Sequence, residues 1–137
     1  MAFVDKTVAV KADIHRVYEL WAVFEDYPKF MDVVEHVHVF EEGRLHWAAF
    51  FDEELLEWDA DLVEHIPEER ITWHALDGRE TGQVRFEKID AASTRVHYQL
   101  EYEPAAWQGK ADTVRHWMRR RVESDLAAFK QVVEASA

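Results

Sequence analysis

Apolar and polar residues alternate with a period of two from about residue 33 onward. The clearest case is residues 94–102 (TRVHYQLEY), where Val96, Tyr98, Leu100 and Tyr102 alternate with polar neighbours. This pattern is typical of a strand with one buried and one solvated face. Together with the turn residues between the runs, it predicts strands at 33–41, 44–50, 54–64, 69–77, 80–88 and 93–102.

Helical periodicity occupies the two ends of the sequence. A first strand at 3–10 is followed by Asp13, a good N-cap for a helix over 14–24, and by a short helix at 26–31. The last segment, 107–134, is predicted to be one long helix. Its apolar stripe recurs at helical spacing and consists of Val114, Met118, Val122, Leu126, Phe129 and Val133.

The order of these elements predicts an α+β fold with one domain over residues 1–137. The short turns, such as Glu42-Gly43 and Asp77-Gly78, favour antiparallel neighbours, because parallel pairing requires a long crossover. A curved antiparallel sheet of seven strands needs a cover for its apolar face. The long C-terminal helix is the one element large enough to supply it.

Composition and charge mainly exclude classes of function. The 137 residues contain no cysteine, which excludes disulfides and thiolate metal sites. The net charge of −12 disfavours nucleic acid and anionic membranes as partners. No apolar run approaches the ~20 residues of a membrane span, and charges interrupt the apolar N-terminus. A cytoplasmic protein is therefore expected, with its oligomeric state, monomer or homodimer, left open.

Three bulky indoles fall on the inner faces of the predicted strands, at Trp47, Trp58 and Trp73. Small residues such as Ala60 and Gly82 stand beside them, and large residues next to small ones leave room within a wall. The mixture indicates a cavity, although a solid aromatic core is the alternative, since protein interiors pack closely. Gly82 also fits a bulge or a bend of its strand.

Candidate chemistry in the sequence is sparse. His36, His38 and His46 are expected on the outer face of the sheet, paired across strands rather than holding a metal. The basic run 119–121 (RRR) is interpreted as a solvated helix face. No serine stands in a nucleophile-elbow context, and no glycine-rich loop precedes a helix. No metal and no cofactor are expected.

Five segments carry a resemblance that covers the whole chain: 27–31 (YPKFM), 56–62 (LEWDADL), 69–78 (ERITWHALDG), 82–87 (GQVRFE) and 125–134 (DLAAFKQVVE). They resemble the polyketide cyclase/dehydrase branch of the START-like (SRPBCC) superfamily, including its coenzyme-Q-binding relatives. The resemblance implies a helix-grip fold, with the sheet wrapped around the C-terminal helix and a mostly apolar cavity between them.

The expected function is binding or transport of a small hydrophobic or aromatic ligand, such as a lipid, a quinone or a polyketide-like molecule. Its predicted site combines the inner faces of the strands and the facing helix. The expected ligand-binding residues are Trp47, Trp58, Ala60, Trp73, Gly82, Val84, Phe86, Tyr98, Tyr102, Val114, Met118 and Val122.

Whether the chain is an enzyme is left open. Aromatase/cyclase members of the family use an inward arginine with a tyrosine or similar partner, and general acid–base work needs a donor within about 3 Å of the reacting oxygen. The weak candidates for such a set are Arg70, Tyr98 and Tyr102, because Arg85 and Arg95 point outward by alternation. A protein–protein interaction module is the second alternative.

Overall fold

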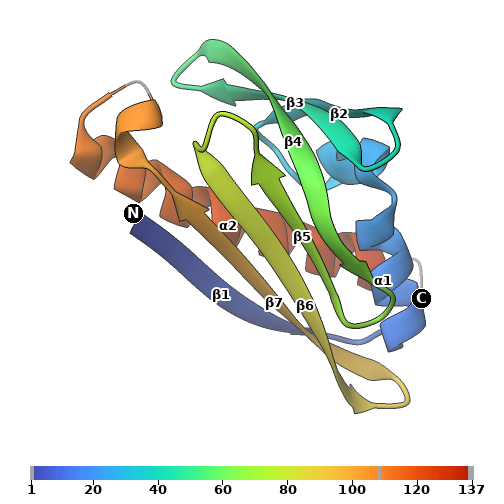
Figure 1. The fold of residues 1–137 in the computed structure, drawn as a ribbon. Coiled ribbons are helices and arrows are strands. Elements are labelled where there is room, and N and C mark those ends of the chain that lie inside the picture. The colour runs from blue at the N-terminus through green and yellow to red at the C-terminus, as the bar shows by residue number, and fades with distance from the viewer. Residues whose placement is uncertain (1, 108, 136–137) are drawn as a thin grey trace.

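The computed structural model describes residues 2–107 and 109–135. Within them the chain forms a seven-stranded sheet and two α-helices, with two short 3-10 helices (Figure 1). The elements, in chain order, are β1 (Ala2–Val10), α1 (Ile14–Ala22), η1 (Phe24–Lys29), β2 (Val34–Glu41), β3 (Arg44–Phe51), β4 (Glu54–Ile66), β5 (Arg70–Ala75), β6 (Glu80–Asp90), β7 (Ser93–Tyr102), η2 (Pro104–Ala106) and α2 (Ala111–Ala135).

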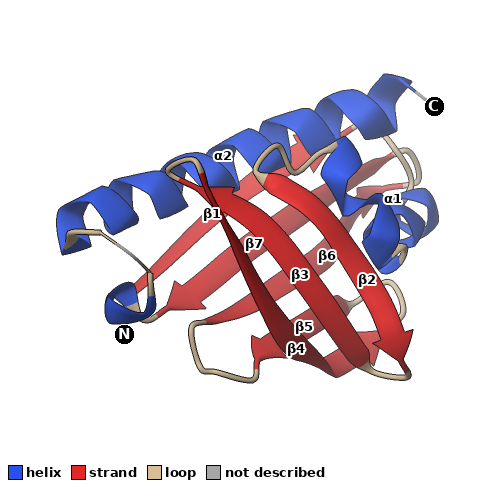
Figure 2. Cartoon of the chain, turned by 90° about the horizontal axis from the view of Figure 1, so that it is seen from above, coloured by secondary structure: helices blue, strands red, loops and turns tan. Residues whose placement is uncertain are grey.

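The sheet is antiparallel throughout and curves around the long helix. Its strand order is β1-β7-β6-β5-β4-β3-β2. The last strand in the sequence, β7, therefore pairs with the first, β1, and with β6 on its other side. Helix α2 lies across the concave face and packs mainly against β1 (Figure 2). The predicted α+β helix-grip architecture is confirmed.

The connection between β1 and β2 has a local explanation. The side chain of Asp13 accepts a hydrogen bond from the Arg16 backbone N–H at 3.1 Å, so Asp13 caps α1 as predicted. The second short helix begins earlier than predicted, at Phe24, and is a 3-10 helix that includes Pro28. The Tyr27 hydroxyl donates to the carbonyl of Trp21 at 2.6 Å and fixes this turn against α1.

Helix α2 begins at Ala111, four residues later than predicted. Residues 104–106 form a separate 3-10 turn, and Trp107 follows in an extended conformation with its side chain buried. Gln108, inside the predicted helix, lies outside the described residues. Trp107 is therefore buried from an extended segment before α2 and does not belong to the first turn of the helix.

The inner faces of the strands carry the core that the alternation predicts. Trp47, Trp73 and Tyr98 are fully buried, and Trp58 is nearly so. Gly82 pairs with Trp73 across β5 and β6, and a Cβ atom at Gly82 would overlap the Trp73 indole. The β6–β7 register is regular at Gly82, so this glycine marks a close approach of a ring rather than a bulge.

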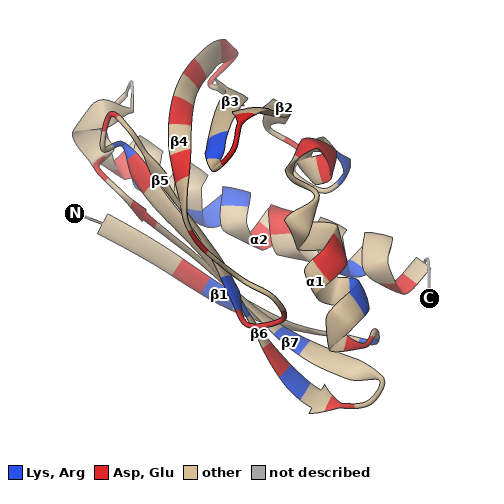
Figure 3. Cartoon of the chain, turned by 45° about the vertical axis from the view of Figure 1, so that its right-hand side comes forward, with Lys and Arg blue, Asp and Glu red and all other residues tan. Residues whose placement is uncertain are grey.

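Charge is distributed unevenly over the elements (Figure 3). Strand β4 carries five acidic residues and no lysine or arginine, whereas basic residues recur along α2. In the part of the chain that the structure describes, neither helix combines the length and the apolar character that a membrane crossing requires.

Candidate functional site

A pocket of about 350 Å³ opens between α2 and the turn that links η1 to β2. The turn contributes Asp32 and Val33. The helix contributes residues spaced by three or four positions, so that they share one face. They are Thr113, His116, Trp117, Arg120, Arg121, Ser124 and Asp125.

The inner end of this pocket is a buried ion pair. Arg121 Nη1 donates to Glu80 Oε1 at 2.8 Å, and Nη2 donates to Oε2 at 3.4 Å. Both side chains are fully buried. Burial acts to lower the pKa of Arg121, but the charge of the paired Glu80 carboxylate raises it, and the net shift is upward. Arg121 is therefore a permanent cation at the pocket wall.

This placement corrects the interpretation of the run 119–121 as a solvated face. Arg119 and Arg120 are exposed, but Arg121 is 3% exposed and points into the interior. Its third donor, Nε, is buried and has no hydrogen-bond partner among the described residues. Arg121 lines the pocket, but Nε itself is covered, so a ligand oxygen would reach this donor only after a local shift of side chains.

Asp125 stands one helical turn beyond Arg121 and is also buried. The Tyr98 hydroxyl donates to Asp125 Oδ2 at 3.4 Å. Burial raises the pKa of Asp125 to about 8, with Asp32 and Glu80 adding to the shift and Arg121 opposing it. The carboxyl group is thus mostly protonated at neutral pH, and it can donate a hydrogen bond or a proton.

Aromatic rings form the apolar wall beside these groups. Trp117 meets Phe51 edge to face, with 4.9 Å between ring centroids, and lies 5.6 Å from the ring of Trp107. The guanidinium carbon of Arg121 sits 5.6 Å from the Trp117 ring centroid, within cation–π range. The pocket therefore combines flat apolar surface with a small set of polar groups.

The predicted ligand-binding residues lie on the inner faces of the sheet and of α2, and all twelve are buried. None of them is among the residues that line the pocket. The indoles pack against one another instead: Trp47 is stacked on Trp58 at 6.2 Å and lies 5.4 Å from Trp73. The indole N–H groups of all three, and that of Trp21, are buried without a partner among the described residues.

The weak catalytic candidates are not brought together. Arg70 Nε donates to Glu64 Oε2 at 3.0 Å, in a row with Thr72 and Gln83 on the outer face. Tyr98 belongs to the opposite, inner face, so the predicted pairing of Arg70 with Tyr98 or Tyr102 is wrong. Arg121, unlike Arg70, lies in the interior, and Tyr102 is a buried core residue.

Glu80, Arg121 and Asp125 were missed, although the sequence contains a signal for each. Glu80 is in phase with the inward set Gly82, Val84 and Phe86. Arg121 follows Met118 by three positions, and Asp125 follows it by seven, so both belong to the buried stripe of α2. The neighbouring arginines and the overall polarity of this helix made it hard to see from the sequence that Arg121 and Asp125 lie on its buried stripe.

With this geometry defined, comparison with known proteins gives the class. Residues 10–130 match the family described as polyketide cyclase / dehydrase and lipid transport. The fold is that of the START-like, or SRPBCC, superfamily. The chain belongs to the polyketide cyclase / dehydrase and lipid transport family.

The chain is 29% identical over 136 residues to an uncharacterized 17.2 kDa protein in the melC2-rnhH intergenic region of Streptomyces lincolnensis, covering 98% of this chain and 91% of that protein. It superposes on a START superfamily protein from Mycobacterium smegmatis with a TM-score of 0.83 at 15% identity, covering 98% and 99% of the two chains. The superposition on the Zhui aromatase/cyclase from Streptomyces sp. R1128 has a TM-score of 0.75 at 21% identity and covers 98% of this chain and 92% of that one. At these identities the structural likeness shows the fold alone.

Proposed function

We propose that this protein binds a small aromatic ligand that carries a carbonyl or phenol oxygen, in the pocket between α2 and residues 32–33. The observation that carries the proposal is the unpartnered Nε donor of Arg121, buried at the pocket wall. A buried donor without a partner costs about 1–3 kcal/mol. A ligand oxygen that reached Nε after a local side-chain shift would recover that cost and fix the orientation of the ligand.

The dimensions and surface of the pocket support a ligand of a few rings. Its volume of about 350 Å³ is at the lower end of the ~300–1,000 Å³ typical of ligand sites. Trp117 supplies a flat ring for stacking. Burying ~150 Å² of an aromatic ligand contributes roughly 4 kcal/mol at ~25 cal/mol per Å².

The sheet tryptophans, which the sequence predicts as ligand contacts, would form an inner extension of this site. Four unpartnered indole donors in one core are unusual, because buried polar groups are normally hydrogen-bonded. A longer ligand with further oxygen atoms would give partners to Trp47, Trp58 or Trp73. Ala60, on the same inner face, would then lie near the bound molecule.

The test is a binding titration with quinones, flavonoids and fatty acids, followed by calorimetry and thermal shift. We expect an oxygenated aromatic compound to bind, and Ser124→Trp, which fills the pocket, to weaken it at least tenfold. Ala127→Trp is the matched control, since Ala127 is exposed on α2 and does not line the pocket.

Equal affinity in both variants would refute the pocket as the site. Loss of affinity in Ala60→Val, with Ser124→Trp unaffected, would transfer the site to the sheet tryptophans. A panel in which no compound binds would refute the binding function itself.

A second candidate function is dehydration or cyclisation of a polyketide-like substrate. The observation that favours it is Asp125, whose pKa of about 8 suits a general acid at neutral pH. In this step a water molecule in the pocket would take the α-proton of a β-hydroxy ketone, and Arg121 would stabilise the enolate oxygen that results. The enolate electrons would then form the carbon–carbon double bond as the β-hydroxyl leaves as water with the proton of Asp125. Asp125→Asn should abolish ultraviolet-detected enone formation while ligand affinity persists. Unchanged turnover in that variant would exclude this role.

A further inference from the structure

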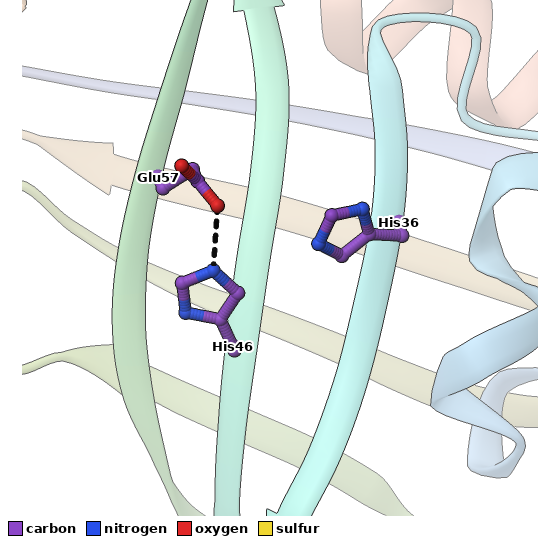
Figure 4. A group of neighbouring side chains, drawn as sticks. All are labelled: His36, His46 and Glu57. Carbon is purple, nitrogen blue, oxygen red and sulfur yellow. Dashed lines mark hydrogen bonds and ion pairs between the residues drawn. The ribbon is translucent and has the colours of Figure 1, made fainter.

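Two histidines and a glutamate converge on the outer face of the sheet, the face opposite to the pocket. They are His36 on β2, His46 on β3 and Glu57 on β4 (Figure 4). Each offers one ligand atom, and the three atoms lie within 4.8 Å of one another. Figure 4 shows the two imidazoles and the carboxylate directed toward a common region above three neighbouring strands.

The strand register explains why these side chains meet. Ala48 on the middle strand is the cross-strand partner of both His36 and Glu57. His46 lies two residues away on the same face of β3. Ala48 is fully buried although its place in the strand register puts it on the outer face. A small residue at this position provides the space in which the three side chains converge.

Asp59 holds the central histidine in the orientation that a metal requires. His46 Nδ1 lies 2.7 Å from Asp59 Oδ1, and Nε2 lies 3.0 Å from Glu57 Oε1. A carboxylate can only accept, so Nδ1 donates to Asp59 and Nε2 is directed at Glu57. This is the carboxylate–histidine arrangement that orients metal-bound imidazoles in proteins.

We infer that His36, His46 and Glu57 form a binding site for a divalent transition-metal ion of the Zn²⁺ class. Two imidazoles and one carboxylate suit Zn²⁺, with a fourth position open to water. The ion would take the place of the proton between His46 Nε2 and Glu57. Tetrahedral bonds of ~2.0–2.1 Å need ligand atoms roughly 3.4 Å apart, so the side chains, which now bring these atoms within 4.8 Å, would have to draw closer around the ion.

Neighbouring residues favour this ion further and restrict its ligands to three. Asp59 and Asp61 of β4 lie on the same face as Glu57, and their negative charges attract cations there. His38 is the cross-strand partner of His46, but its Nδ1 is paired with Glu25 Oε2 at 3.2 Å. The sequence alone favours no metal at His36, His38 and His46, because nothing in it guarantees that three ligands converge. The register between β3 and β4 brings Glu57 to this place as the third ligand.

The test is calorimetric titration of the untagged full-length protein with ZnCl2, in a buffer that does not bind metal. We expect one saturable site per chain, weakened at least tenfold by His36→Ala and by Glu57→Gln. His97→Ala is the matched control, because His97 also lies on the outer face beside a glutamate, at 3.4 Å from Glu87. This variant should bind Zn²⁺ as the natural sequence does.

Circular dichroism distinguishes loss of the site from loss of the fold. His36 and Glu57 are exposed, so both variants should keep the native spectrum. Absence of saturable uptake by the natural sequence would overturn the inference. So would equal uptake in His36→Ala, Glu57→Gln and His97→Ala, since zinc would then bind to scattered histidines.

Discussion

Arg121 of α2 and Glu80 of β6 meet at 2.8 Å with both side chains fully buried, and so connect the helix to the middle of the sheet. Removing one of the two charges leaves the other unpaired in a low-dielectric interior, and this costs roughly 3–5 kcal/mol of folding free energy. We therefore expect Glu80→Gln to lower the free energy of unfolding by about that amount in urea denaturation.

Glu87→Gln on the same strand is the control for this prediction. Glu87 forms an exposed ion pair with Arg95 at 2.8 Å, and exposed pairs contribute only about 0–1 kcal/mol. A loss in Glu80→Gln no larger than that in Glu87→Gln would show that the buried pair is not a major tie between the layers.

Asp125 makes stability depend on pH in a direction unusual for a carboxyl group. Its pKa is about 8 in the folded protein and 3.8 in the reference state, so between these values only the folded chain keeps the proton. The free energy of unfolding should therefore fall as pH rises through this interval, by up to ~1.4 kcal/mol per pH unit from this group.

Asp125→Asn should remove that contribution and flatten the profile measured by urea denaturation between pH 4.5 and about 8. The exposed Asp112 at the start of α2 provides the control substitution, Asp112→Asn, which should keep the slope of the natural sequence. If the slope persists in Asp125→Asn, another group is responsible for it.

Gly82 provides a third prediction, because the Trp73 indole occupies the space that a side chain would need. Gly82→Ala should lower the free energy of unfolding by about 1–3 kcal/mol, the usual cost of overpacking a core. Shortening the ring should relieve the overlap, so Trp73→Phe is expected to cost less in the Gly82→Ala background than alone. Additive losses in this double-mutant cycle would contradict direct contact as the cause.

The fold was predictable because the spacing of apolar residues within each element shows whether that element is a strand or a helix. Alternation in β6 and β7 and the stripe on α2 identify the elements, and short turns determine how the strands pair. One turn had no such signal. Asp52 and Glu53 link β3 to β4 with φ of 50° and 69°, a conformation that usually selects glycine or asparagine. Pairing of the two long strands imposes it here.

The candidate site was only partly predictable. Alternation identifies which residues face inward, but not whether they leave space between them or pack together, as Trp47 and Trp58 do. The pocket itself depends on how far the turn at Asp32 and Val33 stands from α2, and no local pattern encodes that distance. Arg121 belongs to a run of three arginines, which suggested a solvated helix face although the helical position of Arg121 lies on the buried stripe of α2.

The two halves of α2 are held very differently. Near its C-terminus, Lys130 Nζ donates to the Ala9 carbonyl at 3.0 Å, and Glu134 accepts from the Lys11 backbone N–H at 2.8 Å. The N-terminal half instead borders the pocket. A tilt of α2 about this anchored end would widen the pocket only by stretching the buried Arg121–Glu80 pair, so that pair limits how far α2 can move away from residues 32–33.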